Sequence, residues 1–171
     1  MKTILAIETS CDETAISIIK MDEPTMTGRI LSHIVHTQID IHAEYGGVYP
    51  MLAKRDHILN CIPVLDQALK KSGLYQKRES ALELDEKIIS IVRDEICKHE
   101  DTLASQIIEY IKNTDVPNID YIALKNEHLL NKNNPLYTLI DFKQAQSIAV
   151  KDNYQTWILL TLSLWMQQNL T

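Results

Sequence analysis

Two apolar runs near the N-terminus constrain the fold more than any other feature of this sequence. The runs 4–7 and 15–19 flank a polar turn, residues 8–14, which is packed with hydroxyls and carboxylates. Apolar runs of this kind on either side of a short turn predict a β-hairpin. The usual Asn-Gly or Asp-Gly hairpin turn is missing. We therefore expect this turn to carry chemistry, because functional residues concentrate on loops that rigid strands hold. The alternative is an ordinary solvated turn.

The composition bounds the class of protein. The 171 residues suffice for one domain with a buried core. The formal net charge of −6 argues against autonomous nucleic-acid binding, because phosphate contacts need concentrated positive charge. Three cysteines without a C-x-x-C pair fit a reducing compartment. The apolar stretch before Glu8 is too short for a signal peptide. We expect a cytoplasmic protein that does not enter a membrane.

The rest of the sequence predicts alternating strands and helices. A third strand, 30–39, would complete a three-stranded antiparallel meander. Apolar residues at helical spacing predict a helix over 51–72, with Gly73 as its C-cap. The later elements are two amphipathic helices within 76–113 broken near His99, a strand at 119–124, a helix at 136–150 and an apolar element at 157–165. This order predicts an α/β protein with a mixed sheet, an antiparallel meander and flanking helices.

Three motifs, in this order, carry a family resemblance. They are the turn 7–14 (IETSCDET), the segment 38–48 (QIDIHAEYGGV) and residues 55–57 (RDH). Together they closely resemble the N-terminal lobe of the TsaD family, the glycoprotease-like (Gcp) tRNA N6-adenosine threonylcarbamoyltransferases. The resemblance implies the N-terminal lobe of an actin-like ATPase, or ribonuclease H-like, fold. Residues 1–171 would form this single lobe, with 76–113 as a helical insertion within it.

The resemblance also implies an activity and its requirements. Family members transfer a threonylcarbamoyl group from its adenylate to N6 of the adenosine beside the tRNA anticodon. They use one Fe or Zn ion and work with partner proteins. For this chain we expect other subunits of the threonylcarbamoyladenosine complex as partners and contact with tRNA only within that complex. Pairing as a dimer through the helices of the lobe is a further expectation.

The sequence departs from the family pattern after residue 124. Residues 125–128 (KNEH) stand where the family has a Gly-Pro-Gly type turn, and the His-x-x-x-His metal pair and the second lobe have no counterpart. We therefore expect this incomplete chain to bind no metal or cofactor by itself. Two functions stay open. One is a truncated or degenerate transferase that needs a second chain, and the other is a non-catalytic binding lobe that pairs with subunits of the same complex.

The candidate site residues lie on the polar turn. Asp12 and Glu13 are adjacent carboxylates that could act as catalytic acid or base, and in an actin-like lobe this turn would face an interdomain cleft. Solvated carboxylates are the alternative. Hydroxyls and backbone amides of a tight turn can donate to phosphate oxygens. The candidate substrate- or nucleotide-binding residues are Thr9, Ser10, Cys11 and Thr14. For Cys11 we favour a small buried thiol over a nucleophile, because the local sequence shows no base.

The histidines do not indicate a metal site. His33 and His36 are three residues apart, which on a strand puts them on opposite faces, so they cannot converge on one ion. His42, beside the glycine pair 46–47, is expected to order its loop through a hydrogen bond, and contact with a substrate is the alternative. The basic residues scattered over 54–78 predict a solvated face. Contact with tRNA or a partner is the alternative for that face.

Overall fold

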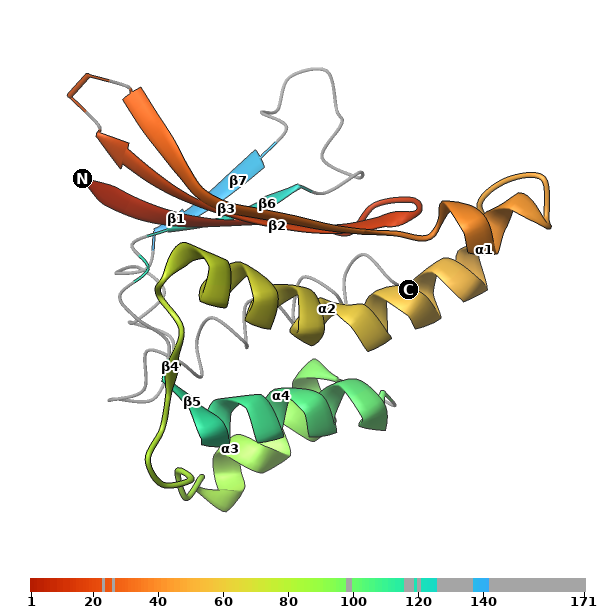
Figure 1. Cartoon of the computed structure of the whole chain (residues 1–171). Helices are drawn as coiled ribbons and strands as arrows, with labels where there is room; N and C mark the ends of the chain where they lie inside the picture. Colours follow the sequence, from red (N-terminus) through yellow and green to blue (C-terminus); the bar gives the residue numbers. More distant parts are fainter. Residues whose placement is uncertain are drawn as a thin grey trace.

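The computed structural model of the chain describes residues 1–22, 24–25, 27–97, 100–115, 119, 121–125 and 137–141. These residues form three layers (Figure 1). A β-sheet lies on one side, the long helix α2 crosses one face of the sheet, and shorter helices lie on the far side of α2. In this described part of the chain, no helix is both long and apolar enough to cross a membrane.

Five strands form the sheet in the order β3-β2-β1-β6-β7. β1 (Lys2–Glu8), β2 (Glu13–Asp22) and β3 (Thr27–Thr37) form an antiparallel meander. β6 (Tyr121–Lys125) pairs in parallel with β1, and β7 (Tyr137–Asp141) pairs antiparallel with β6. The predicted hairpin, the meander and the mixed α/β sheet are thus confirmed.

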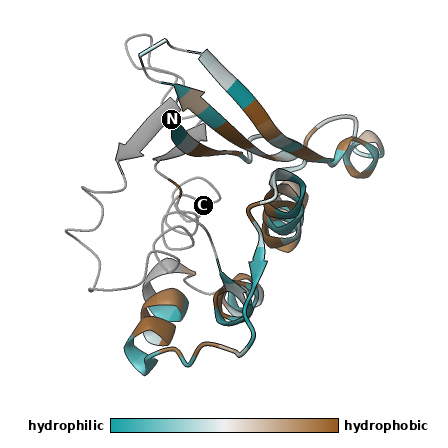
Figure 2. Ribbon diagram, turned by 60° about the vertical axis from the view of Figure 1, so that its left-hand side comes forward, coloured by the Kyte–Doolittle hydropathy of each residue, from teal (hydrophilic) through white to brown (hydrophobic). Residues whose placement is uncertain are grey.

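The register of the hairpin puts the apolar residues of both strands on one face. Leu5 pairs with Ile18 and Ile7 pairs with Ile16, and all four side chains are buried in the core against α2. Apolar and polar residues alternate along the strands (Figure 2). Burying one such side chain contributes about 1.5–3 kcal/mol. A register shifted by one residue would expose the apolar set, so the period-two pattern selects the observed pairing.

Helix α2 (Pro50–Ser72) has clear signals at both ends. Proline stands at its first position, where the missing N–H has no helical role. At the other end, Gly73 adopts left-handed backbone with φ +76°, and its N–H bonds to the carbonyls of Leu69 and Lys70. The predicted helix and its glycine cap are confirmed.

Residues 76–115 form a helical hairpin beside α2. The hairpin begins and ends in a two-stranded ribbon, in which β4 (Gln76–Lys77) pairs with β5 (Thr114–Asp115). Between them lie α3 (Glu86–Ser90), the π-helical turn η1 (Ile91–Ile96) and α4 (Asp101–Asn113), so the predicted break between two helices is confirmed. The helix α4 packs on α2 and buries the predicted apolar stripe Leu103, Ile107, Ile108 and Ile111.

Two predicted elements are wrong in part. The expected helix over 136–150 is incorrect at its start, because 137–141 form the strand β7. Tyrosine, threonine and isoleucine favour strands, and the edge of β6 offers them hydrogen-bonding groups. Residues 142–150 and the apolar element 157–165 lie outside the described residues. The third strand stops at Thr37 rather than Ile39, because Ile39–Ala43 form the short helix α1.

Candidate functional site

The turn between β1 and β2 is organised by Glu8. The Glu8 carboxylate accepts hydrogen bonds from the backbone N–H of Ser10, at 2.8 Å, and from the Ser10 hydroxyl. The Glu13 N–H bonds to the Ser10 carbonyl at 3.4 Å, and Cys11 adopts left-handed backbone with φ +55° at the tip. Sequence reasoning missed this role of Glu8. The signal that could have found it is a carboxylate placed directly at the end of an apolar strand.

The turn combines buried hydroxyls with partly exposed carboxylates. Thr9 and Thr14 are buried, whereas Asp12 and Glu13 keep contact with solvent. The Thr9 hydroxyl has no hydrogen-bond partner among the described residues. Buried polar groups in proteins are nearly always paired, so an unpaired one is a candidate contact for a ligand. The structure therefore brings the predicted turn residues together with one unsatisfied hydroxyl among them.

Cys11 is exposed, so the prediction of a small buried thiol is wrong. The residue occupies the tip of the turn, outside the paired strands, and this position leaves the thiol in contact with solvent. The backbone of Cys11, rather than its thiol, is engaged by the fold. Its carbonyl lies 3.3 Å from Nε2 of His57.

His57, a buried residue of α2, joins the turn to the helix. The Thr14 hydroxyl lies 2.8 Å from His57 Nδ1, and Gln38 Nε2 lies 3.2 Å from the same nitrogen. Because Nε2 faces the carbonyl of Cys11, which can only accept, Nε2 carries the proton and Nδ1 is the acceptor. A neutral imidazole ring fits this pattern, because the Gln38 amide nitrogen beside Nδ1 can only donate.

The electrostatic surroundings of His57 agree with a neutral ring. Burial lowers the pKa of His57 below its usual value of 6.5, because burial disfavours the charged form. The hydrogen bond to the Cys11 carbonyl and the charges of Asp56 and Glu8 act in the opposite direction without cancelling this effect. His57 is therefore a structural hydrogen-bonding group at neutral pH rather than a cation.

Gln38 extends this network to the glycine loop. Its Oε1 lies 3.0 Å from His42 Nε2, and His42 Nδ1 accepts the backbone N–H of Tyr49 at 3.3 Å. The backbone N–H of Gln38 also bonds to the Asp12 carbonyl at 2.7 Å. His42 thus orders the loop around Gly46, as predicted. Sequence reasoning missed Gln38 and His57, although both belong to the motifs that carry the family resemblance.

An apolar surface lies beside the turn. Helix α1 and the loop that follows it project beyond the end of the sheet at which the turn lies (Figure 1). Six side chains of α1, this loop and the first turn of α2 are 42–69% exposed, and together we call them the α1 patch: Ile39, Ile41, Tyr45, Val48, Tyr49 and Met51. The rings of Tyr45 and Tyr49 lie 5.5 Å apart within this group. Exposed apolar side chains gathered on one short segment are a candidate interaction site.

Metal-binding side chains do not gather in the described part of the chain. Over those residues, no group of three or more His, Cys, Asp or Glu could hold a metal ion. His36 Nε2 lies 2.8 Å from Asp56, whereas His33 Nδ1 lies 2.6 Å from the Ser17 hydroxyl on the neighbouring strand. The two histidines therefore make separate contacts, as expected. These residues do not fit the Fe or Zn ion that the family resemblance implies.

Several of the basic residues on and after α2 are neutralised by carboxylates. The ion pairs are Lys54 with Glu100 at 3.1 Å, Lys70 with Asp66 at 2.6 Å, and Arg78 with Asp115 at 3.1 Å. This arrangement fits the predicted solvated face better than a surface for phosphates, which needs uncompensated positive charge.

These features define a class: an α/β protein whose mixed sheet presents a polar turn, held by a buried histidine network, beside an exposed apolar surface. Comparison with known proteins adds the family. Residues 29–81 match the model of the TsaD family, tRNA N6-adenosine threonylcarbamoyltransferase. The N-terminal portion of the chain is therefore related to this family, as its three motifs predict.

Individual relatives support the same relationship. The tRNA N6-adenosine threonylcarbamoyltransferase of Anaeromyxobacter dehalogenans is 50% identical over 74 residues, which are 43% of this chain and 21% of that protein. The protein of the same description from Persephonella marina is 52% identical over 71 residues, 42% of this chain and 19% of the relative. The matched segment thus spans about a fifth of the length of these relatives.

Proposed function

We propose that this chain is an actin-like N-terminal lobe that takes part in forming tRNA N6-threonylcarbamoyladenosine together with a second chain. Residues 1–171 would form one domain, with the helical hairpin as an insertion over 76–113. The β1–β2 turn carries the proposal. It belongs to the first family motif, and it combines two partly exposed carboxylates with the Thr9 hydroxyl, which lacks a partner within the described structure.

The turn carboxylates suit the proton transfer that this reaction needs. The adenosine N6 attacks the carbamoyl carbon of threonylcarbamoyl-adenylate, the bond from that carbon to the phosphate oxygen breaks, and AMP leaves with the electron pair. N6 must lose a proton during this exchange. Asp12 or Glu13 is the proposed acceptor, since both are partly exposed on a turn that Glu8 holds rigid.

The hydroxyls of the turn differ in their availability to phosphate oxygens. The Ser10 hydroxyl donates to Glu8, and the Thr14 hydroxyl donates to His57. The proposed contact with the adenylate phosphate therefore falls to Thr9 and to the backbone amides of the turn. Ser10, Cys11 and Thr14 would shape the turn around that contact.

A second chain is part of the proposal because the α1 patch offers exposed apolar side chains that a partner could cover. That chain would supply the metal and the opposite wall of the cleft. We also propose a cytoplasmic location, because three cysteines without a C-x-x-C pair fit a reducing compartment.

Modification of tRNA in the presence of threonylcarbamoyl-adenylate tests this proposal. We expect no modification by the chain alone, and modification when a chain carrying the His-x-x-x-His motif is added. In that mixture the double substitution Asp12→Asn and Glu13→Gln should lower the rate about 100-fold or more. Glu83→Gln, in an exposed loop, is the control. Modification by the chain alone would disprove the need for a partner, and an unchanged rate of the double variant would disprove the role of the carboxylates.

The alternative proposal is a non-catalytic lobe that pairs with other subunits of the same complex. The α1 patch favours it, because its six exposed apolar side chains suit an interface and require no catalysis. This alternative predicts a stable complex with a family member in analytical ultracentrifugation. It also predicts that substitution of Asp12 and Glu13 leaves tRNA modification by that complex unchanged.

A further inference from the structure

Gln38 lies at the junction between the polar turn and the loop that follows α1. It directly precedes α1 and is 1% exposed. Its backbone N–H donates to the Asp12 carbonyl at 2.7 Å, and its backbone carbonyl accepts the N–H of His42 at 3.1 Å. One buried residue is thus bonded both to the turn that carries the candidate catalytic carboxylates and to the glycine loop.

The side-chain hydrogen bonds around Gln38 run in one direction. His42 Nδ1 accepts the backbone N–H of Tyr49, so the ring proton of His42 lies on Nε2, which donates to Gln38 Oε1 at 3.0 Å. This contact sets the orientation of the amide and leaves Gln38 Nε2 at 3.2 Å from His57 Nδ1. His57 Nε2 then donates to the Cys11 carbonyl at 3.3 Å. A chain of hydrogen bonds therefore leads from the glycine loop to the tip of the turn, and each donor in it meets an acceptor.

The amide group explains why glutamine suits this position. Its carbonyl oxygen accepts from His42, and its NH₂ group donates toward His57. A carboxylate offers acceptors alone, and an apolar side chain offers neither group. The Thr14 hydroxyl lies 2.8 Å from the same nitrogen of His57. Both neighbours of Nδ1 can thus donate to it, which favours the His57 tautomer with its proton on Nε2.

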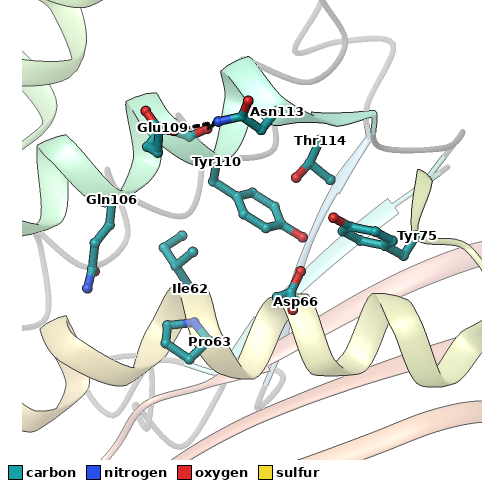
Figure 3. Close-up of a pocket in the computed structure, with 9 residues that line it drawn as sticks. All are labelled: Ile62, Pro63, Asp66, Tyr75, Gln106, Glu109, Tyr110, Asn113 and Thr114. Carbon is teal, nitrogen blue, oxygen red and sulfur yellow. Dashed lines mark hydrogen bonds between the residues drawn. The ribbon is translucent and has the colours of Figure 1, made fainter. Parts of the chain in front are cut away.

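Helix α2 provides a fixed base for His57. The helix packs on the sheet with its buried face and on α4 with its other side. Further along α2, Asp66 lies beside the hydroxyls of Tyr75 and Tyr110, which point toward one another (Figure 3). These contacts hold α2 without any help from the polar turn. The contacts of His57 therefore position the turn relative to the helix rather than the helix relative to the turn.

We propose that Gln38 is a positioning residue of the candidate site, which holds the turn that carries Asp12 and Glu13 by fixing the tautomer of His57. With the proton on Nε2, His57 donates to the Cys11 carbonyl. With the proton on Nδ1, Nε2 and that carbonyl would face each other as two acceptors, and the contact would be lost. The effect on catalysis rests on the proposed function, whereas the control of the His57 tautomer does not.

Nitrogen NMR of the imidazole rings tests the tautomer in the unsubstituted chain, because it distinguishes a protonated nitrogen from an unprotonated one. We expect the proton of His57 on Nε2 at neutral pH. The charged or titratable neighbours of His57 are Asp56, Glu8 and His36. Burial outweighs the two carboxylates and keeps the pKa of His57 below 6.5. A proton on Nδ1 would overturn the proposal without any substitution.

Gln38→Glu tests the control of this ring by residue 38. A carboxylate replaces the donor beside Nδ1 and favours a second proton on the ring, so the midpoint of the His57 titration should rise by about one pH unit or more. Gln106→Glu is the matched control. It makes the same change on the side of α4 that faces α2, where Gln106 Nε2 lies 3.5 Å from the Leu59 carbonyl (Figure 3). The control should leave the His57 titration unchanged, and an unchanged midpoint in Gln38→Glu would refute the proposal.

Hydrogen exchange measures how firmly the turn is held. The amide hydrogen of residue 38 bonds to the Asp12 carbonyl, so its exchange reports on the attachment of the turn. Gln38→Leu preserves the approximate volume and removes the side-chain hydrogen bonds, and it should speed this exchange about tenfold. The Leu5 amide in the central strand β1 should exchange at an unchanged rate, which separates local release from global unfolding. Unchanged exchange at residue 38 would show that the turn is held without this side chain.

Kinetics of tRNA modification test the effect on catalysis, in the mixture with a chain that carries the His-x-x-x-His motif. Gln38→Leu should lower kcat about tenfold or more with little change in KM for the adenylate, because Gln38 positions the carboxylates and is placed away from the substrate. An unchanged kcat would refute the positioning role even where the NMR result holds. Absence of modification with the unsubstituted chain would refute the proposed function and this effect on catalysis together, and the NMR and exchange results would then decide the control of the turn by themselves.

Discussion

At the residue scale, the candidate site depends on the protonation state of one buried ring. His57 donates from Nε2 to the Cys11 carbonyl and accepts at Nδ1 from Thr14 and Gln38. A second proton on the ring would place an N–H against the amide N–H groups of Gln38, which cannot accept. The turn is therefore held in place by a neutral histidine, and its stability depends on pH.

Acidification should destabilise the folded chain through His57. Its pKa lies below 6.5 in the folded state and returns to about that value on unfolding. Between these two pKa values the unfolded chain binds more protons, so the contribution to stability is full above pH 6.5 and is lost as the pH falls. Urea unfolding at pH 7.5, 6.5 and 5.5 measures this. His57→Gln should flatten the dependence, whereas His33→Gln, at an exposed position, should not. Parallel curves for His57→Gln and the unsubstituted chain would contradict this role.

The three thiols should react at very different rates. Cys11 is exposed, whereas burial raises the pKa of Cys61 to about 12 and that of Cys97 to about 11. Because the thiolate is the reactive form, a thiol reagent at pH 7.5 should modify one cysteine of the native chain quickly and two slowly. Cys11→Ser should abolish the fast phase and Cys61→Ser should preserve it. Equal rates for all three thiols would show that Cys11 is covered.

At the scale of elements, α2 connects the parts of the structure. Its N-terminal half carries His57 toward the turn, its buried face covers the meander, and its other side packs on α4. Two glycines have different roles. Gly73 is the C-cap of α2, whereas Gly28 lies on β3. Gly73 has φ +76°, which side chains disfavour, whereas Gly28 lacks positive φ, and a Cβ added there would meet Ile19 at an ordinary 3.5 Å. The end of α2 therefore depends on the glycine at residue 73 more than β3 depends on the glycine at residue 28.

Replacing the C-cap should measure this dependence. Gly73→Ala forces a Cβ into left-handed backbone and should lower the free energy of unfolding by about 1–2 kcal/mol. Gly28→Ala should change it by less than about 0.5 kcal/mol, as is usual for surface substitutions that break no special feature. Urea unfolding at neutral pH gives both values. Equal losses in the two variants would mean that the left-handed cap is not the reason for glycine at residue 73.

At the scale of the whole molecule, the α1 patch predicts association of the chain with itself. Its six apolar side chains are exposed, and α1 lies beyond the end of the sheet at which the polar turn lies (Figure 1). Surface of this kind associates with itself when its proper partner is absent. The chain purified alone should therefore form concentration-dependent oligomers.

Sedimentation velocity over a range of concentrations measures this association. Ile39→Gln combined with Met51→Gln should shift the distribution toward monomer, because it replaces two of the exposed side chains of the patch. Ile30→Gln removes an isoleucine of β3 that lies outside the patch and is more exposed than Ile39, and it should leave association unchanged. Monomeric behaviour of the unsubstituted chain at all concentrations would contradict this role of the patch.

Local sequence patterns were sufficient to predict the features that depend on near neighbours. The alternation in 4–7 and 15–19 is enough for the hairpin, and the spacing of apolar residues with Gly73 is enough for α2, because such patterns are set within a few residues. Three ordered motifs were likewise enough for the family relationship. The tertiary structure alone decided the exposure of Cys11, the strand at 137–141 and the contact between Thr14 and His57, which are 43 positions apart. Each of these depends on which distant segment lies alongside, and only the packed chain settles that.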